Sequence, residues 1–235
     1  MSRLDDMEHE GRRRLAAIRQ AMGEHGHDLL VIYGTTGVGT PMNGNYAYAS
    51  NHMPIYAASL MALPREGKPI LFVPGENQHL EARAVSWIDD VRLAPRPVED
   101  LCAHLASNFP AVTDIAISSL AALPELAAQT IRSHFPGAKL SDAAATVFSC
   151  RTVKSATEQH FLRRATEIAD QGLARSIEML KPGVSELDWK AETEAVMTAN
   201  GADGGFNMIS AGQPRPGADA FMGYVISPTA RKFAS

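Results

Sequence analysis

Hydrophobic and polar positions follow two different periods along the first 150 residues. Leu15, Ile18 and Met22 recur at helical spacing, which predicts a helix over residues 7–22. Residues 28–33, in which a continuous apolar run follows Asp28, predict a buried strand directly after this helix. Two further apolar runs flank the turn at residues 64–67, a pattern typical of a hairpin.

The same reasoning extends to residue 150. It predicts helices at 77–87, 98–110 and 124–134 and a short strand at 114–118. The tyrosine-bearing residues at 41–50 are not predicted to begin a helix. Strands alternating with helices predict one α/β unit whose sheet is mostly covered.

The pattern changes near Arg151, where we predict a domain boundary between residues 1–150 and 151–235. Ser155 and Glu158 form a capping box at the start of a long amphipathic helix, which should end at Pro182-Gly183. A second helix is predicted from Ser185 to about residue 200. The first of these two helices has an apolar face made of six residues: Leu162, Ala165, Ile168, Leu173, Ile177 and Leu180.

Two strands, at 206–210 and 221–227, are predicted after these helices, joined by the loop 211–220. A hairpin packed on two helices has an unpaired edge and is marginal without further strands. We therefore expect residues 151–235 to be an incomplete unit.

Composition is that of a folded globular protein, with 45% hydrophobic and 20% charged residues. The net charge of −4 gives no reason to expect binding to nucleic acid or an anionic membrane. No apolar run approaches the roughly 20 residues of a membrane span, and the charged N-terminus does not fit a secretory signal. We expect a cytoplasmic protein in which Cys102 and Cys150 are buried thiols.

Candidate chemistry is sparse. The loop at residues 34–40 follows a strand but lacks the lysine of a phosphate-binding loop, so a structural loop is favoured over a nucleotide site. No serine lies in a nucleophile elbow, and no two histidines have the spacing of a zinc site. Residues 161–235 contain no histidine or cysteine, so this part of the chain is not expected to build a metal site alone.

One group stands out as a candidate substrate pocket or dimer contact. His52 follows a stretch of polar and aromatic residues suited to lining a pocket. The alternative is that His52 is an exposed loop histidine, as His25 and His27 are expected to be. The group consists of Asn45, Tyr46, Tyr48, Asn51 and His52.

Several segments resemble the creatinase, prolidase and Xaa-Pro aminopeptidase family. These are the stretch 151–170, the turn 181–188 between two helices, and the later FNMISAG. Arg151, Val153, Lys154 and Ser155 fit the family's passage from its N-terminal domain into the first helix of the "pita-bread" catalytic domain. Residues 28–31, Asn45-Tyr46 and the hairpin at Gly67 are similar to the family's N-terminal domain.

The resemblance implies a fold and a chemistry. It implies a creatinase-type N-terminal α/β domain followed by an incomplete pita-bread (α+β) catalytic domain, because residues 231–235 resemble the lead-in to the metal ligands. A full-length member would use two divalent ions (manganese, cobalt or zinc) on a small peptide or amide substrate. We expect residues 1–235 alone to bind no metal and to be inactive, and we expect a homodimer.

Two alternatives remain open. Peptide-cleaving members carry a histidine in the region that corresponds to residues 212–220, where this sequence has none. That leaves room for relatives acting on creatine-like, ectoine-like or sulfonium compounds. The chain also fits a non-catalytic dimerisation or binding module of the same fold.

Overall fold

The structure is a computed structural model that describes residues 3–35 and 43–202. It divides into two compact units, residues 1–154 and residues 155–235. The helices of the first unit are α1 (Arg3–Glu24), α2 (Asn43–Ser50), α3 (Glu76–Val85), α4 (Pro97–Asn108), the 3-10 turn η1 (Leu120–Ala122), α5 (Glu125–His134) and α6 (Ala144–Thr152). Its strands are β1 (Leu29–Gly34), β2 (Ser59–Pro64), β3 (Ile70–Val73), β4 (Asp90–Leu93), β5 (Asp114–Ser118) and β6 (Lys139–Asp142).

The strands form a six-stranded sheet in the order β4-β3-β2-β1-β5-β6. The pairs β1–β5, β5–β6 and β3–β4 are parallel, whereas β2 runs antiparallel to both β1 and β3. The predicted hairpin is therefore confirmed as β2–β3. Strand β1 lies between β2 and β5. Gly34 at the end of β1 lies against the Tyr46 ring, and Ser59 at the start of β2 hydrogen-bonds Tyr46.

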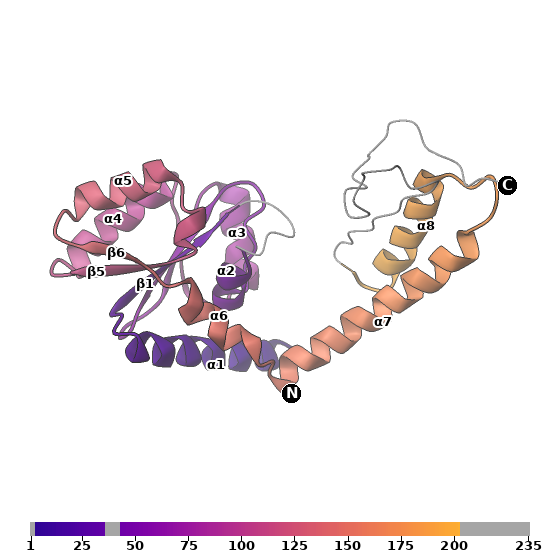
Figure 1. The fold of residues 1–235 in the computed structure, drawn as a ribbon, viewed down its shortest axis with the longest axis horizontal. Coiled ribbons are helices and arrows are strands. Elements are labelled where there is room, and N and C mark those ends of the chain that lie inside the picture. The colour runs from indigo at the N-terminus through magenta and orange to yellow at the C-terminus, as the bar shows by residue number, and fades with distance from the viewer. Residues whose placement is uncertain (1–2, 36–42, 203–235) are drawn as a thin grey trace, which may run out of the picture. The chain divides into compact units, whose positions relative to one another are not determined.

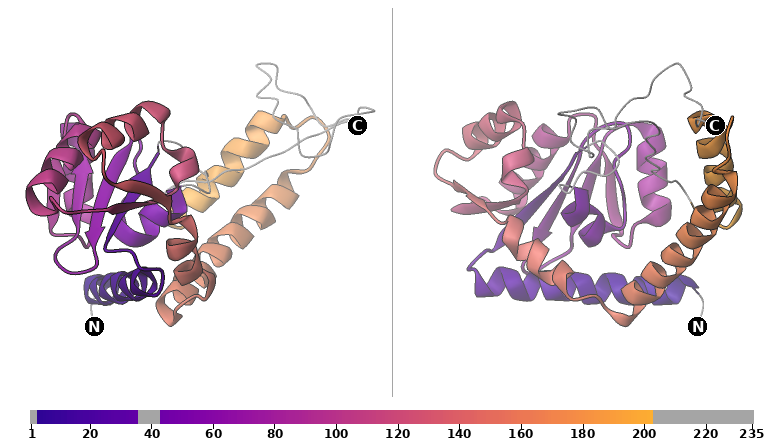
Figure 2. Two further views of the ribbon diagram at one scale, coloured as in Figure 1. Left: turned by 60° about the vertical axis from the view of Figure 1, so that its left-hand side comes forward. Right: turned by 45° about the vertical axis from the view of Figure 1, so that its right-hand side comes forward.

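Helices cover both faces of this sheet (Figures 1 and 2). Leu29, Val31 and Tyr33 of β1 pack toward α4 and α5, since side chains alternate between the two faces of a strand. Leu30 and Ile32 pack on the opposite side with α1, α2, α3 and α6. The predicted α/β unit with a covered sheet is confirmed.

Several elements of this unit were predicted wrongly or not at all, among them helix α6, for which no helix was predicted. Residues 43–50 form helix α2, although the sequence analysis did not expect a helix there. The edge strands β4 and β6 were not predicted, and both are only partly buried. The predicted strands at 28–33 and 114–118 and the helices at 77–87, 98–110 and 124–134 are confirmed to within about two residues.

The second unit contains α7 (Ala156–Met179) and α8 (Glu186–Ala199). Ser155 accepts from the backbone N–H of Glu158 at 3.1 Å, and the Glu158 carboxylate accepts from the backbone N–H of Ser155 at 2.9 Å. The predicted capping box is confirmed. The indole of Trp189 in α8 donates to the Ser176 carbonyl of α7 at 2.9 Å, which joins the two helices.

Of the six residues in the apolar face predicted for the first of these helices, Ile168 is buried, whereas the other five are exposed. Ile168, Gly172 and Ser176 are buried, and a Cβ on Gly172 would come within 2.6 Å of Met197. The helices therefore approach through small residues. Leu173 and Ile177 remain 57% and 62% exposed.

Among the described residues, the helices include none that is both long and apolar enough to cross a membrane. The strands predicted at 206–210 and 221–227, the loop 212–220 and most of the loop 34–40 lie outside the described residues.

Candidate functional site

The candidate residues gather on α2 and the turn that follows it. Asn45, Tyr46 and Tyr48 lie in α2, and Asn51 and His52 follow its last residue. Asn51 has a φ of 58°, a left-handed conformation that asparagine tolerates, and this reverses the chain at the helix end. The structure thus brings the five predicted residues into one region of the first unit.

Four of the five are buried. Tyr46 and His52 are 0% and 1% exposed, and Asn45 and Tyr48 are each 6% exposed. The alternative reading of His52 as an exposed loop histidine is therefore wrong. Within a single chain these side chains contact their own domain, so a role as pocket or dimer residues stays a prediction.

A buried chain of hydrogen bonds runs through Tyr46 to His52. The side-chain amide of Gln78 donates to the Ser59 hydroxyl at 3.0 Å, and Ser59 in turn contacts the Tyr46 hydroxyl. Tyr46 Oη lies 3.3 Å from His52 Nδ1. With Ser59 donating its hydroxyl hydrogen to Tyr46, the Tyr46 hydroxyl donates to His52 Nδ1. The imidazole proton of His52 is then on Nε2.

Burial controls the ionisation of this pair. It raises the pKa of Tyr46 well above its usual range and lowers that of His52 to about 4. His52 Nε2 has no hydrogen-bond partner among the described residues. His52 is therefore expected to stay neutral at physiological pH, with a buried Nε2 that bonds no other residue of the described ranges.

This gives a pH prediction. Because the pKa of His52 is lower in the folded state than its ordinary 6.5, its contribution to stability is complete above pH 6.5 and is lost as the pH falls toward 4. In NMR titrations the His52 ring signals should stay at their neutral positions down to about pH 5. A midpoint near 6.5 would contradict the buried environment described above.

Gln78 of α3 orders the segment that follows His52. Its Oε1 accepts the backbone N–H groups of Ile55, Tyr56 and Ala57 at 3.1, 3.0 and 3.3 Å. Its Nε2 donates to the Ala57 carbonyl at 2.9 Å. A single buried amide therefore fixes a loop on which Ile55 and Tyr56 are 52% and 76% exposed.

Asn45 connects α2 to the last turn of α6. Its Oδ1 accepts from the Arg151 guanidinium at 2.8 Å, and its Nδ2 donates to the Ser118 hydroxyl at 2.9 Å. The Lys154 ammonium donates to the Arg151 carbonyl at 2.8 Å, near the end of α6. Arg151 and Lys154, which belong to the segment that resembles the family's passage between domains, are thus linked to the candidate residues by the Arg151–Asn45 hydrogen bond.

Gly44 lies against the same arginine. A Cβ at this position would overlap the Arg151 guanidinium, the mobile end of a long side chain, so Gly44→Ala should displace Arg151 and break its bond to Asn45. We expect a loss of about 1–2 kcal/mol in the free energy of unfolding, measured by urea titration. Gly23→Ala is the matched control, because a Cβ there meets nothing within 4 Å and should be neutral or stabilising.

A double-mutant cycle checks the cause. In an Arg151→Ala background the Gly44→Ala change should cost much less, because the contact it breaks is already gone. Additive effects of the two changes would contradict the proposed displacement.

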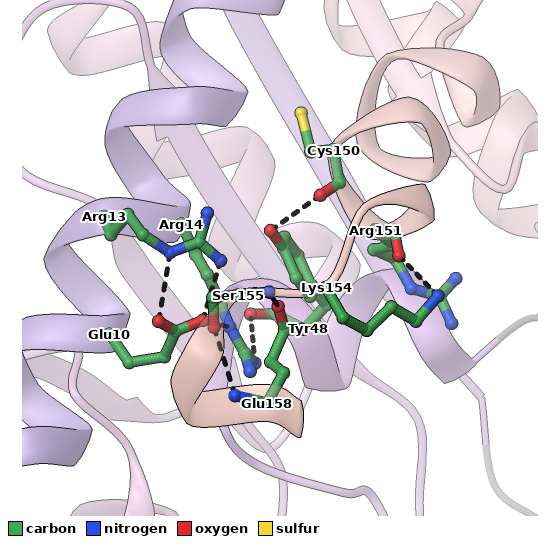
Figure 3. A network of polar contacts seen from close by, with 9 residues as sticks. All are labelled: Glu10, Arg13, Arg14, Tyr48, Cys150, Arg151, Lys154, Ser155 and Glu158. Carbon is green, nitrogen blue, oxygen red and sulfur yellow. Dashed lines mark hydrogen bonds and ion pairs between the residues drawn. The ribbon is translucent and has the colours of Figure 1, made fainter. Parts of the chain in front are cut away.

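A charged cluster fastens α1 to α2 (Figure 3). The carboxylate of Glu10, whose side chain is 2% exposed, accepts from Arg13 at 2.7 Å and from Arg14 at 2.8 Å. The Arg14 guanidinium lies 4.5 Å from the ring centroid of Tyr48 and 5.2 Å from that of Trp87. The Tyr48 hydroxyl then donates to the Cys150 carbonyl of α6 at 3.0 Å.

The described residues do not fit a dinuclear metal site. No group of three or more His, Cys, Asp or Glu side chains is close enough there to hold an ion. His27, expected to be solvated, instead pairs with Asp114 at 3.2 Å, while His25 is exposed. Cys102 is buried as predicted, which raises its pKa to about 11, but Cys150 is partly exposed.

Sequence reasoning missed the residues that support the candidates. Gln78 appeared as one polar residue of a helix, and Glu10 as one of many charges in the N-terminal segment. The Glu10–Arg13–Arg14 spacing of three and four residues was the one available signal, since it allows pairing on a helix surface.

Comparison with known proteins places this geometry in context. The model of the creatinase/prolidase N-terminal domain matches residues 14–153. Among solved structures, the chain is similar to the prolidase of Pyrococcus horikoshii, with a TM-score of 0.65 and 21% identity, covering 81% of this chain and 50% of that one. It is also similar to the Xaa-Pro dipeptidase of Bacillus anthracis, with a TM-score of 0.64 and 16% identity, covering 82% of this chain and 50% of that one.

A curated relative is also similar over part of its length. It is the uncharacterized hydrolase/peptidase y4tL of Sinorhizobium fredii, 34% identical over 77 residues, which are 33% of this chain and 20% of that protein. The chain thus spans about half the length of the solved structures and a fifth of the curated relative. At these identities the solved structures establish the fold alone.

Proposed function

The chain belongs to the creatinase/prolidase N-terminal domain family, and from this premise we propose that it forms the N-terminal part of a hydrolase acting on a small peptide or amide. The observation that carries the proposal is the family match over residues 14–153 together with the six-stranded α/β unit. Two of the similar proteins are a prolidase and an Xaa-Pro dipeptidase, and their activities support a peptide substrate.

The candidate residues have a positioning role in this proposal. Asn45, Tyr46, Tyr48 and His52 are buried and bonded within the domain. We assign them to holding α2 and the segment after it, so that Asn51 and the exposed Ile55 and Tyr56 meet substrate or a second copy of the chain. A cytoplasmic location and a homodimer are part of the same proposal.

Two divalent ions, manganese, cobalt or zinc, belong to the proposal for the whole protein. Such ions supply an activated water for hydrolysis when bound. The described residues do not assemble a site for them, and residues 161–235 contain no histidine or cysteine. We therefore assign the metal ligands to further sequence.

The test begins with the coding sequence downstream of codon 235, since a continuation carrying aspartate, histidine and glutamate ligands is expected. The product of that sequence should hydrolyse a substrate in a manganese- or cobalt-dependent way. Assays with Ala-Pro, Gly-Pro, creatine and ectoine as substrates distinguish a peptidase from an enzyme that acts on creatine-like or ectoine-like compounds. Turnover of creatine or ectoine with no action on either dipeptide would overturn the peptide proposal.

A binding module is the second candidate, and the loop held by Gln78 favours it. A buried glutamine fixes a backbone segment that presents an exposed tyrosine and isoleucine, and preordered aromatic residues are common at protein interfaces. Light scattering after size exclusion should give a dimer for residues 1–235. Ile55→Ser with Tyr56→Ser should shift it toward monomer, whereas Leu126→Ser, at an exposed site on α5, should not.

A further inference from the structure

A cleft of about 460 Å³ lies between β4 and α4, on the side of the sheet opposite α2. The buried Phe72 and Ala94 line it and are called its apolar floor below, and polar side chains from both elements also line it. The polar set comprises Arg92 of β4 and Asp100, His104, Ser107 and Asn108 of α4. A concave site with an apolar floor and a few convergent polar groups is typical of small-molecule binding.

His104 connects the polar residues of the cleft through hydrogen bonds to its ring. Its Nδ1 lies 3.2 Å from Arg92 Nη1 and 3.2 Å from Asn108 Nδ2. Both partners are donors, so Nδ1 accepts and the imidazole proton resides on Nε2. Burial and the Arg92 charge lower the pKa of His104, which keeps the ring neutral and leaves Nε2–H as a donor.

Arg92 is held in place from the other side. Its Nε and Nη2 donate to the two carboxylate oxygens of Asp90 at 2.9 and 2.7 Å. This bidentate pair and the His104 contact fix the plane of the guanidinium. The pair offsets part of the positive charge, so Arg92 and His104 act mainly as oriented donors toward an acceptor such as a carboxylate.

Asp100 supplies the opposite charge one helical turn away. It precedes His104 by four residues on α4, a rise of about 6 Å along the helix. Its Oδ2 accepts from the backbone N–H of Arg96 at 3.3 Å, which steadies the carboxylate. The cleft therefore has a donor-rich centre and an acidic end about one turn apart.

We propose that this cleft binds a short zwitterion, with its carboxylate at Arg92 and His104 and its ammonium group at Asp100. The separation favours an ω-amino carboxylate with a few methylenes between its charges over an α-amino acid, whose charges are adjacent. The apolar floor would contact the methylenes. This site is independent of the proposed hydrolase function, because none of its residues belongs to the region around α2.

The test uses four probes on the ¹⁵N-labelled chain: γ-aminobutyrate, butyrate, butylamine and glycine. γ-Aminobutyrate should shift the amide signals of β4 and α4 saturably in the millimolar range, as expected for so small a ligand. The three other probes, each lacking one charge or the spacing, should bind about three- to fivefold more weakly, the scale of one exposed ion pair.

Two variants make the assignment specific. Asp100→Asn should remove the advantage of γ-aminobutyrate over butyrate, whereas Glu99→Gln, an exposed acid on the same turn outside the cleft, should retain it. Unchanged amide spectra elsewhere report that each variant is folded. The proposal is overturned if γ-aminobutyrate gives no saturable shift, if butyrate binds equally well, or if Glu99→Gln has the effect of Asp100→Asn.

Discussion

Replacing Glu10 with glutamine is expected to lower the free energy of unfolding at pH 7 by about 2–3 kcal/mol, below the roughly 3–5 kcal/mol of a fully buried charge pair because the Arg13 side chain is 36% exposed. The Glu10 side chain is 2% exposed and bonds both Arg13 and Arg14. Glutamine would remove the charge of the carboxylate that the Arg14 guanidinium bonds at 2.8 Å, and the Arg14 side chain is only 14% exposed. Since Arg14 also packs on Tyr48, the loss should loosen α2 against α1.

The pH dependence of stability provides a second readout. Burial by itself raises the pKa of Glu10, but the hydrogen bonds and charges of Arg13 and Arg14 outweigh it and hold the pKa at about 2, against an ordinary 4.5. A carboxylate with a lowered pKa stabilises the fold above its ordinary pKa, and that stability is lost as the pH falls from 4.5 toward 2. The glutamine variant should lose less stability over this interval.

The Glu8–Arg12 pair is the matched control for Glu10. This pair lies on the same helix with a similar spacing, but the Glu8 and Arg12 side chains are 65% and 72% exposed. Glu8→Gln should therefore change stability by less than about 0.5 kcal/mol. Equal effects at Glu8 and Glu10 in urea titrations would show that burial of the cluster is not what matters.

Replacing Gln78 with alanine is expected to cost about 3 kcal/mol, because several polar groups lose their partner at once. The backbone N–H groups of residues 55–57 lose an acceptor, and the Ser59 hydroxyl and Ala57 carbonyl lose a donor. Gln78→Glu should also destabilise the fold, because a carboxylate keeps the acceptors but cannot donate to Ala57 or Ser59.

Hydrogen exchange distinguishes a local effect from general weakening. Relative to the unmodified protein, Gln78→Ala should accelerate exchange at the amides of Ile55, Tyr56 and Ala57 more than at the amides of the central strand β1. The control is Gln129→Ala on α5, since Gln129 is exposed and donates only to Glu125. If the Gln78 and Gln129 variants exchange alike at residues 55–57, Gln78 has no role in ordering this loop.

The sequence predicted the central parts of the fold because burial leaves a direct pattern there. Strand β1 is continuous apolar residues covered on both faces, and the Ser155–Glu158 capping box is a purely local interaction. The edge strands β4 and β6 escaped prediction because Asp90–Leu93 and Lys139–Asp142 mix charged and apolar residues and are only partly buried. Pairing with β3 and β5, which is non-local, decides their structure.

Helix α2 illustrates tertiary packing overriding local preference. Residues 43–50 include Gly44 and three polar residues, which argue against a helix. Burial of Tyr46, Tyr48 and Ala49 against the sheet and α1 stabilises it instead. The candidate residues were found because aromatic and polar residues cluster in the sequence, whereas Gln78 and Glu10 were missed because their role depends on burial that no local pattern reports.

We propose that this chain is the N-terminal part of a hydrolase whose metal ligands lie in further sequence. Titration calorimetry of manganese, cobalt and zinc into purified residues 1–235 should therefore show no stoichiometric binding of any of the three ions, a result that follows directly from this proposal. Saturable binding of two ions per chain, abolished by changing carboxylate or histidine residues within 1–235, would contradict it.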